Sequence, residues 1–216
     1  MRGPCYLDPI DLNHPDQLHE LRRQRSLCGW DYHPNKLQEW RQKNSEGLKN
    51  LFWIVVTDVD HGRPITAEES SRAGHISLDA YCEPPDPDLA RADRSVLAIQ
   101  TFFILPEYRL AGLGRHVMYL AERLAAQEPN CRYVALTALS KKYMYQEGPD
   151  WRGIWERMGQ PMPDFSIQEW YEKAGYVGWK EEPRYKELSL KGEVIWLHEV
   201  FMRKEIRREG EEDVRT

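Results

Sequence analysis

Short apolar runs alternate with amphipathic stretches along the chain, a pattern that predicts a mixed α/β fold. Apolar runs of strand length indicate β-strands, while helical spacing, proline starts and a capping box indicate helices. We expect strands at 51–57, 73–81, 95–105, 133–139, 176–180 and 194–203, and helices at 15–28, 34–42, 113–127 and 166–174. The order of these elements predicts one mixed sheet flanked by helices, in a single domain that covers residues 1–203.

Two further segments are irregular or strongly polar. Residues 140–165 contain several glycines and prolines and are predicted to form a long insertion, and long loops of this kind are often functional. Residues 204–216 carry almost no apolar side chains, so we expect a disordered polar tail. Aromatic side chains gather in and after the insertion, at Tyr143, Tyr145, Trp151, Trp155, Phe165 and Trp170.

Composition and charge exclude several classes of protein. The chain has 216 residues, of which 30% are charged, and its net charge of −5 argues against an unspecific nucleic-acid binder. No run approaches the roughly 18 apolar residues of a membrane helix, and the first residues lack the apolar core of a signal peptide. The four cysteines form no Cys-x-x-Cys pair and lie beside no histidine at metal-ligand spacing. We therefore expect reduced thiols, a cytoplasmic protein, no membrane or nucleic-acid partner and no bound metal.

The turn between the strand at 95–105 and the helix at 113–127 carries the clearest chemical signal. It contains Arg109, Gly112 and Gly114, and a strongly amphipathic helix begins directly after it. The first turn of a helix presents unpaired N–H groups at the positive end of its dipole, and glycines let a phosphate approach the backbone. The pattern predicts a site for a di- or pyrophosphate, with a plain strand-to-helix turn as the alternative.

The residues of this turn do not match the common nucleotide-binding patterns, Gly-x-Gly-x-x-Gly and Gly-x-x-x-x-Gly-Lys-Ser/Thr. They form Arg109-x-x-Gly112-x-Gly114, and residues 170–176 form Trp-Tyr-Glu-Lys-Ala-Gly-Tyr. The first resembles the acetyl-coenzyme A loop of the GNAT (Gcn5-related N-acetyltransferase) superfamily, and the second resembles its late aromatic signature. The element order is similar to that family over roughly 51–203, and the motifs match at 96–128 and 166–177.

The resemblance implies a twisted sheet that splays between its fourth and fifth strands, with acetyl-coenzyme A bound in the cleft as co-substrate. The cofactor-binding residues that it implies lie at the end of one strand and in the glycine loop: Phe102, Phe103, Ile104, Arg109, Leu110, Ala111, Gly112, Leu113, Gly114 and Arg115. The insertion is longer than is usual in the family, and Asp164 stands where the family often has asparagine. These departures leave the acceptor substrate open.

Transfer of an acetyl group from a thioester to an amine requires a base for the amine, a donor for the oxyanion and a proton for the departing thiolate. The resemblance implies that a backbone N–H near Phe103 or Ile104 meets the thioester carbonyl and that Tyr171 protonates the thiolate. A phenol suits this task because it is protonated at neutral pH. The alternative interpretation of Tyr171 is a core aromatic residue.

The general base is less clear from the sequence. Strand alternation is expected to place Ala98, Gln100, Phe102 and Ile104 on one face, which then carries no carboxylate. The base stays open among residues of neighbouring predicted strands, namely Asp79, His75, His198 and Glu199. No cysteine is a convincing nucleophile, since direct attack by the amine needs none.

The leading functional hypothesis is an acetyl-coenzyme A-dependent N-acetyltransferase that acts on a primary amine of a small molecule. The alternatives are acetylation of a protein N-terminus or lysine, and a non-catalytic coenzyme A-binding module on the same fold. The insertion at 140–165 is a candidate lid with an aromatic, partly acidic lining for a cationic amine. Its aromatic residues are alternatively packed onto the sheet, or form a contact in a homodimer.

Overall fold

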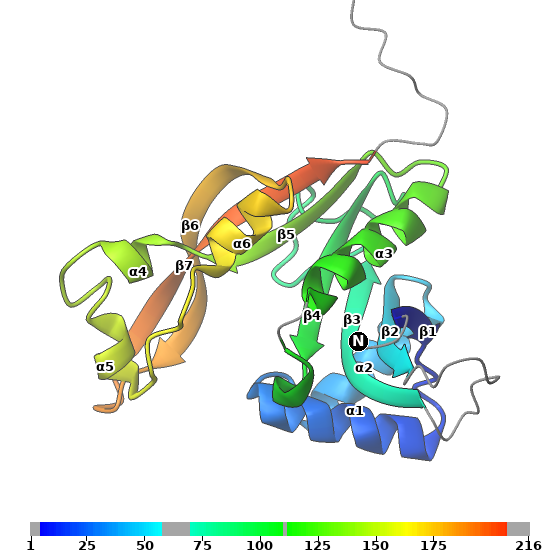
Figure 1. Cartoon of the computed structure of the whole chain (residues 1–216), viewed down its shortest axis with the longest axis horizontal. Coiled ribbons are helices and arrows are strands. Elements are labelled where there is room, and N and C mark those ends of the chain that lie inside the picture. Colours follow the sequence, from blue (N-terminus) through cyan, green and yellow to red (C-terminus); the bar gives the residue numbers. More distant parts are fainter. Residues whose placement is uncertain (1–4, 58–69, 110–111, 207–216) are drawn as a thin grey trace, which may run out of the picture. The chain divides into compact units, whose positions relative to one another are not determined.

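The computed structural model describes residues 5–57, 70–109 and 112–206. Its strands form one mixed seven-stranded sheet with the hydrogen-bonded order β1-β2-β3-β4-β5-β7-β6 (Figure 1). By contacts the chain divides into two compact units, Met1–Val134 with Ile206–Thr216, and Ala135–Glu205. The open sheet with flanking helices confirms the predicted fold class.

The first unit is an antiparallel arrangement of four strands with helices packed on it. Its elements are β1 (Cys5–Pro9), α1 (Pro15–Cys28), α2 (Pro34–Ser45), β2 (Lys49–Thr57), β3 (Ser70–Asp79), β4 (Val96–Ile104), the 3₁₀ helix η2 (Pro106–Tyr108) and α3 (Leu113–Gln127). The pairs β1–β2, β2–β3 and β3–β4 are all antiparallel. This unit carries the predicted phosphate loop between β4 and α3.

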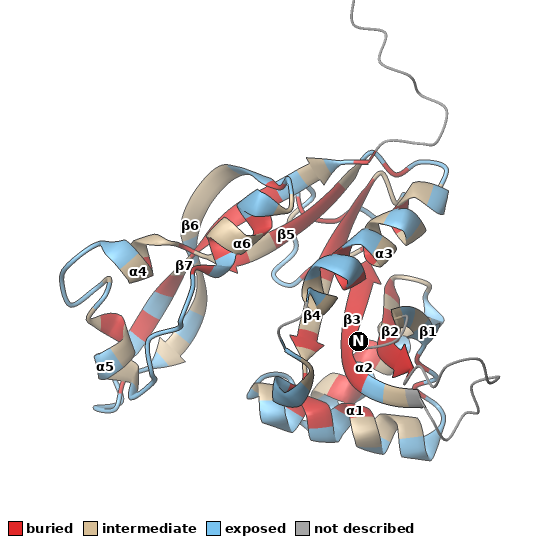
Figure 2. Cartoon of the chain, in the orientation of Figure 1, coloured by how far each residue is buried: buried red, intermediate tan, exposed pale blue. Residues whose placement is uncertain are grey.

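Burial explains why these segments form their elements. Alternate residues of β2 pack with α1 and α2 into one apolar cluster: Ile10, Leu12, Leu21, Leu37, Trp40, Leu51, Trp53 and Val55. Helix α3 buries one stripe, Val117, Met118, Ala121 and Ala125, and its opposite side is exposed (Figure 2). Its bounds match the helix predicted at 113–127. Val117 and Ala121 are buried as the apolar period predicts, and Pro129 lies beyond the end of the helix.

The second unit contains most of β5 (Tyr133–Leu139), the short helices α4 (Lys142–Tyr145), α5 (Ile154–Met158) and α6 (Ile167–Lys173), and the strands β6 (Val177–Leu188) and β7 (Val194–Glu205). The last two strands form a long antiparallel hairpin. One of the two hydrogen bonds of the predicted capping box at the start of α6 is present, because the Ser166 hydroxyl accepts the Glu169 backbone N–H at 3.3 Å.

Several elements differ from the sequence-based prediction. Strand β1 was not predicted, and β6 continues to Leu188 rather than ending at 180. Both lie at the ends of the strand order, where one side of a strand needs no partner and polar residues and prolines are tolerated. Pro183 accordingly lies within β6. The irregular insertion at 140–165 contains the short helices α4 and α5.

The last strand extends two residues beyond its predicted end at 203. Strand β7 runs to Glu205, and the buried Ile206 donates its backbone N–H to the Arg132 carbonyl at 2.8 Å. The rest of the predicted polar tail, from 207 to 216, lies outside the described residues. Across the described part of the chain, no helix combines the length and apolar character needed to cross a membrane.

The insertion is attached to β7 by its aromatic side chains. Tyr143 and Ile154 form a buried cluster with Ile195 and Leu197 of β7, and Trp151 and Trp155 pack against it. The Tyr143 hydroxyl accepts the backbone N–H of His198 at 2.9 Å, and the Trp155 indole donates to the Tyr143 carbonyl at 3.0 Å. This packing agrees with the alternative that the aromatic residues hold the insertion onto the sheet.

Two tyrosines of α4 provide a test of this anchoring. Tyr143→Phe removes the hydroxyl that accepts the His198 backbone N–H within a buried cluster. Because this N–H then has lost its acceptor, we expect the free energy of unfolding to fall by about 1–2 kcal/mol. Tyr145 is 61% exposed and its hydroxyl bonds Glu169, so Tyr145→Phe should cost under about 0.5 kcal/mol. Urea denaturation of both variants measures the difference, and equal losses would contradict the anchoring role.

Candidate functional site

The predicted phosphate loop has the backbone geometry of an anion site. Gly112 is the N-cap of α3 and lies in the left-handed region at φ +80° and ψ 1°. A Cβ at this position would meet no heavy atom of the described residues within 4 Å, so the glycine serves the backbone turn and leaves open space above it. Among the described residues no side chain caps α3, and its first turn carries no acidic residue. The helix N-terminus therefore fits a pyrophosphate.

Arg109 is positioned at the start of this turn by the end of β4. Its Nε donates to the Ile104 carbonyl at 3.0 Å, and its guanidinium lies 5.6 Å from the centre of the Phe103 ring. These two contacts hold a positive charge beside the end of the strand that leads into the loop. Of the other predicted cofactor residues, Leu113, Gly114 and Arg115 form the first turn of α3, while Leu110 and Ala111 lie outside the described residues.

A β-bulge in β4 changes the face on which the predicted site residues lie. Ser77 of β3 pairs with Gln100, whereas His75, two residues away, pairs with Phe103. The extra residue in β4 places Phe103, and not Phe102, on the same face as Gln100. The expectation that Ala98, Gln100, Phe102 and Ile104 share a face was therefore wrong beyond Gln100, because a bulge shifts the alternation by one residue.

Thr101 adopts an uncommon backbone conformation within this bulge. Its φ is +49°, in the left-handed region that β-branched residues rarely occupy and that costs about 1–3 kcal/mol. Gly74 of β3 lies opposite, where a Cβ would come within 2.1 Å of the Phe103 carbonyl oxygen. The two strands can approach this closely only because residue 74 is a glycine.

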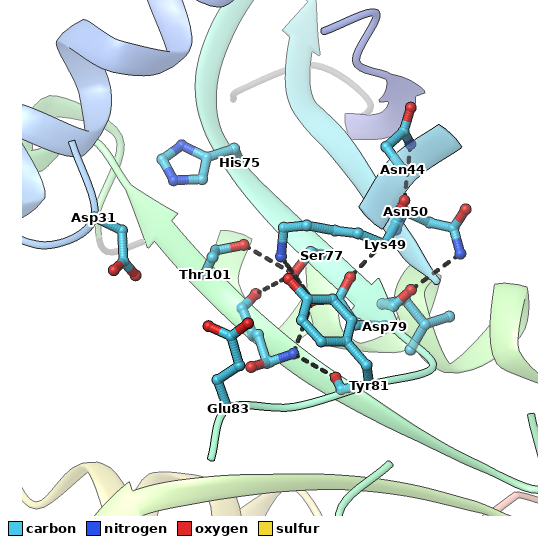
Figure 3. A network of polar contacts seen from close by, with 12 residues as sticks. Asp31, Asn44, Lys49, Asn50, His75, Ser77, Asp79, Tyr81, Glu83 and Thr101 are labelled. Atoms are coloured by element: carbon cyan, nitrogen blue, oxygen red, sulfur yellow. Dashed lines mark hydrogen bonds and ion pairs between the residues drawn. The ribbon is translucent and has the colours of Figure 1, made fainter. Parts of the chain in front are cut away.

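Two of the four candidate bases, Asp79 and His75, lie in a buried polar network beside the bulge (Figure 3). Asp79 forms an ion pair with Lys49 at 2.7 Å and also accepts the Gln100 side-chain amide at 2.8 Å. Burial raises the pKa of Asp79 and lowers that of Lys49, while their mutual attraction opposes both changes. Asp79 is thus a fully buried carboxylate joined to β4 by a side chain of that strand.

His75 is not placed to act as a base toward a ligand. Its Nδ1 lies 2.9 Å from the Gln24 amide oxygen, and its Nε2 lies 3.4 Å from a terminal nitrogen of Arg25. Burial, followed by the positive charges of Arg25 and Lys49, lowers the pKa of His75 well below its usual range. The ring is a neutral core histidine with hydrogen-bond partners at both nitrogens.

Tyr171 and Glu199 lie in the second unit and influence each other electrostatically. Tyr171 is buried on α6, with the Trp170 and Tyr176 rings at edge-on contacts of 4.9 and 5.8 Å between centroids. Burial, and secondarily the Glu199 carboxylate, raise the pKa of Tyr171 above its usual range. The phenol therefore stays protonated at neutral pH, and the raised pKa makes it a weaker acid than an exposed tyrosine.

Glu199 is a buried carboxyl group on β7. Burial raises the pKa of Glu199 to about 8, against the opposing effects of the Arg184 charge and a hydrogen bond from the Thr137 side chain. A carboxyl group with this pKa is mostly protonated at neutral pH, so Glu199 is less suited to act as a base there than an ionised carboxylate. The remaining candidate, His198, packs against the insertion, with its ring 5.2 Å from that of Trp151.

Two acidic residues of the insertion form ion pairs within it. Glu147 pairs with Arg152 at 2.9 Å, and Asp150 pairs with Arg157 at 2.8 Å. A small pocket of about 140 Å³ between the insertion and α6 is lined by residues that include Tyr143, Trp155 and Phe165, and its lining contains no carboxylate. This pocket is apolar rather than acidic.

Comparison with known proteins places the fold and the loop in one family. The family model described as "Acetyltransferase (GNAT) family" matches residues 16–146, more than half of the chain. The chain therefore belongs to the GNAT acetyltransferase family, and it is an acyltransferase by this membership. A search of curated protein sequences finds no match.

Several solved structures share the fold of this chain. NAA60 from Arabidopsis thaliana in complex with acetyl-CoA is 16% identical with a TM-score of 0.57, and 94% of this chain and 99% of that chain are covered. Aminoglycoside 6′-N-acetyltransferase from Enterococcus faecium is 16% identical with a TM-score of 0.56, and the match covers 94% of this chain and 97% of that chain. Spermidine N-acetyltransferase from Vibrio cholerae in complex with CoA and spermine is 14% identical with a TM-score of 0.54, and the match covers 94% of this chain and 95% of that chain. At these identities the similarity shows the fold alone.

The raised pKa of Glu199 leads to a prediction about stability. A carboxyl group whose pKa is raised on folding from 4.5 to about 8 stabilises the protein below pH 4.5, and this stability is lost as the pH rises through about 8. The free energy of unfolding of wild type should therefore decline as the pH rises from 4.5 to about 8. Glu199→Gln should not show this decline, because glutamine does not titrate. Urea denaturation at pH 6 and pH 9 measures it, with Glu205→Gln at an exposed position of β7 as the control. Parallel pH dependence in wild type and Glu199→Gln would contradict the shift.

Proposed function

We propose that this protein transfers the acetyl group of acetyl-coenzyme A to a primary amine of a small molecule, by direct attack in a ternary complex. The observation that carries the proposal is the start of α3, where Gly112 at φ +80° opens an uncapped and acid-free helix N-terminus beside Arg109. This arrangement suits the pyrophosphate of coenzyme A. Membership of the GNAT family indicates that the acetyl donor is the thioester acetyl-coenzyme A.

The proposed reaction forms a C–N bond and breaks the C–S bond of the thioester. The backbone near Phe103 and Ile104 is proposed to hold the thioester carbonyl, and the Tyr171 phenol to protonate the departing thiolate. Tyr171 is buried and protonated at neutral pH, so it carries the proton that this step requires. Direct attack requires no cysteine nucleophile and no resident metal.

Small amines are the proposed acceptors because aminoglycoside and spermidine N-acetyltransferases share the fold over most of both chains. A peptide acceptor is the second possibility that the assay includes. We further propose a cytoplasmic location, in keeping with four cysteines of which none forms a disulfide in the described part of the chain. A homodimer is an untested proposal that light scattering would address.

A coenzyme A release assay tests the proposed activity. Purified protein and acetyl-coenzyme A are combined with aminoglycosides, polyamines, aromatic amines, amino acids and peptides, and thiol release is followed. Release that depends on a small amine supports the proposal, and release with peptides alone would assign the alternative acceptor. Coenzyme A binding without thiol release for any acceptor would indicate a non-catalytic binding module.

The loop assignment predicts a charge-specific loss of coenzyme A binding. Asp and Asn both tolerate the left-handed conformation of Gly112, and a Cβ there meets no atom of the described residues, so both variants should fold. Gly112→Asp places a negative charge at the pyrophosphate site and should abolish binding, while Gly112→Asn should weaken it less. Isothermal titration with coenzyme A measures both, and equal affinities of the two variants would contradict a phosphate site.

The role of Tyr171 is tested by removing only its hydroxyl. Tyr171→Phe keeps the ring contacts with Trp170 and Tyr176, so the affinity for acetyl-coenzyme A should be nearly unchanged. The turnover number should fall by about 10²-fold or more, the usual effect of losing a general acid. A variant that turns over its best amine within about twofold of wild type would show that Tyr171 is a packing residue.

A further inference from the structure

The hydroxyl groups beside the β4 bulge form a chain that ends at a buried carboxylate. The Thr101 hydroxyl donates to the Ser77 oxygen at 2.9 Å, and the Ser77 hydroxyl donates to Asp79 Oδ2 at 2.8 Å (Figure 3). Thr101 is half-buried, whereas Ser77 and Asp79 have no exposed surface. The chain therefore leads from a partly accessible position on β4 into the interior of the first unit.

We propose that Thr101, Ser77 and Asp79 form a proton relay, in which Thr101 contacts the acceptor amine and Asp79 is the terminal proton acceptor. This inference rests on the proposed N-acetyltransferase function and supplies the general base that the sequence left open. It concerns three residues of the first unit that belong to β3 and β4.

The direction of the hydrogen bonds suits proton uptake from the amine. The Ser77 hydroxyl lies 2.8 Å from Asp79 Oδ2 and 3.1 Å from the Gln100 carbonyl oxygen, and the shorter contact directs its proton toward Asp79. Because Thr101 donates to Ser77, an oxygen lone pair of Thr101 can accept a proton from outside the network. Thr101 also lies two residues before Phe103, where the backbone is proposed to hold the thioester carbonyl. An amine that attacks this carbonyl would lie within reach of the same short segment of β4.

The protons balance along this route. The amine loses its first proton to solvent and attacks in its neutral form. As the C–N bond forms, the nitrogen gives a proton to Thr101 Oγ1, the Thr101 proton passes to Ser77 Oγ, and the Ser77 proton passes to Asp79 Oδ2. Tyr171 gives its proton to the thiolate as the C–S bond breaks. The proton on Asp79 later returns by the reverse route, and the phenol is reprotonated from solvent.

The surroundings of Asp79 hold the carboxylate in place for this role. Lys49 Nζ lies 2.7 Å from Oδ2, the Gln100 amide lies 2.8 Å from the same oxygen, and the Asn50 backbone N–H donates to Oδ1 at 3.2 Å. Lys49 in turn is influenced by Arg25 and Asp31, on and just after α1. Burial raises the pKa of Asp79, which brings its proton affinity closer to that needed for a base.

The backbone of Thr101 gives independent support. A β-branched residue at φ +49° is a strained choice for a position that glycine or asparagine would occupy at lower cost. Strained residues of this kind gather at functional sites because the surrounding structure holds a side chain where the function needs it. At residue 101 that side chain is a hydroxyl group at the outer end of the relay.

The test compares Thr101→Val, which keeps the branched shape and loses the hydroxyl, with Thr101→Ser, which keeps the hydroxyl. With the amine that wild type acetylates best, Thr101→Val should lower kcat at least about tenfold, leaving the dissociation constant of acetyl-coenzyme A and the KM of the amine nearly unchanged. Thr101→Ser should restore most of kcat, and Ser77→Ala should match the loss. Ser26→Ala, at an exposed hydroxyl on α1, is the control.

The outcomes separate this relay from the proposed function. If wild type acetylates an amine and Thr101→Val stays within about twofold of it, the relay is wrong and the N-acetyltransferase function stands. If wild type acetylates no amine, both fail. Infrared spectroscopy of the protein without substrates adds a readout that needs no turnover, because Asp79→Asn should remove a carboxylate band at pH 7. Loss of a protonated carboxyl band instead would overturn Asp79 as the proton acceptor.

Discussion

The buried ion pair between Lys49 and Asp79 is the interaction around which the first unit is organised. Lys49 lies on β2, Asp79 on β3, and the Gln100 amide brings β4 to the same carboxylate oxygen, so one charged pair connects three adjacent strands. Removing one partner from such a pair leaves an unpaired buried charge and usually costs about 3–5 kcal/mol. The register of the strands that lead to the predicted phosphate loop is therefore tied to a polar contact and not only to apolar packing.

The pair is tolerated in the interior because aromatic side chains and hydrogen bonds surround it. Lys49 Nζ lies 4.4 Å from the centre of the Trp40 ring of α2, a distance at which the ring face attracts a cation. Trp40 also belongs to the apolar cluster under α1 and α2. The same residue thus joins the apolar core to the polar network, and the network holds the bulge of β4 in one arrangement.

The sequence predicted those parts of the site whose signals are local. The stripe of α3, the strand at 133–139 and the capping box at Ser166 depend on periodicity or on side-chain chemistry within a few residues, and the structure agrees with them. The bulge was not predictable in this way. A left-handed backbone conformation is usually indicated in a sequence by glycine, but the left-handed residue of this bulge is Thr101. The bulge itself results from the pairing of β4 with β3, which lie far apart along the chain.

The same limit explains the edge strands and the insertion. Burial on one face produces the alternation from which a strand is predicted, but β1 and β6 lie at the ends of the strand order and keep charged or proline residues. The insertion is anchored by contacts between residues far apart in sequence, such as the Tyr143 hydroxyl with the His198 N–H. Composition suggested a lid, and only the packing showed where the aromatic rings point.

Tyr171 and Glu199 show how burial connects two titrating groups. Donation of the Tyr171 proton leaves a phenolate, which an ionised Glu199 would oppose, because the negative charge of Glu199 raises the pKa of the phenol. A pKa of about 8 keeps most Glu199 protonated at neutral pH, so this repulsion is small there. As the pH rises through about 8, Glu199 ionises and makes the phenol a weaker acid. Burial therefore raises the pKa of the phenol directly, and the ionisation of Glu199 above pH 8 would raise it further.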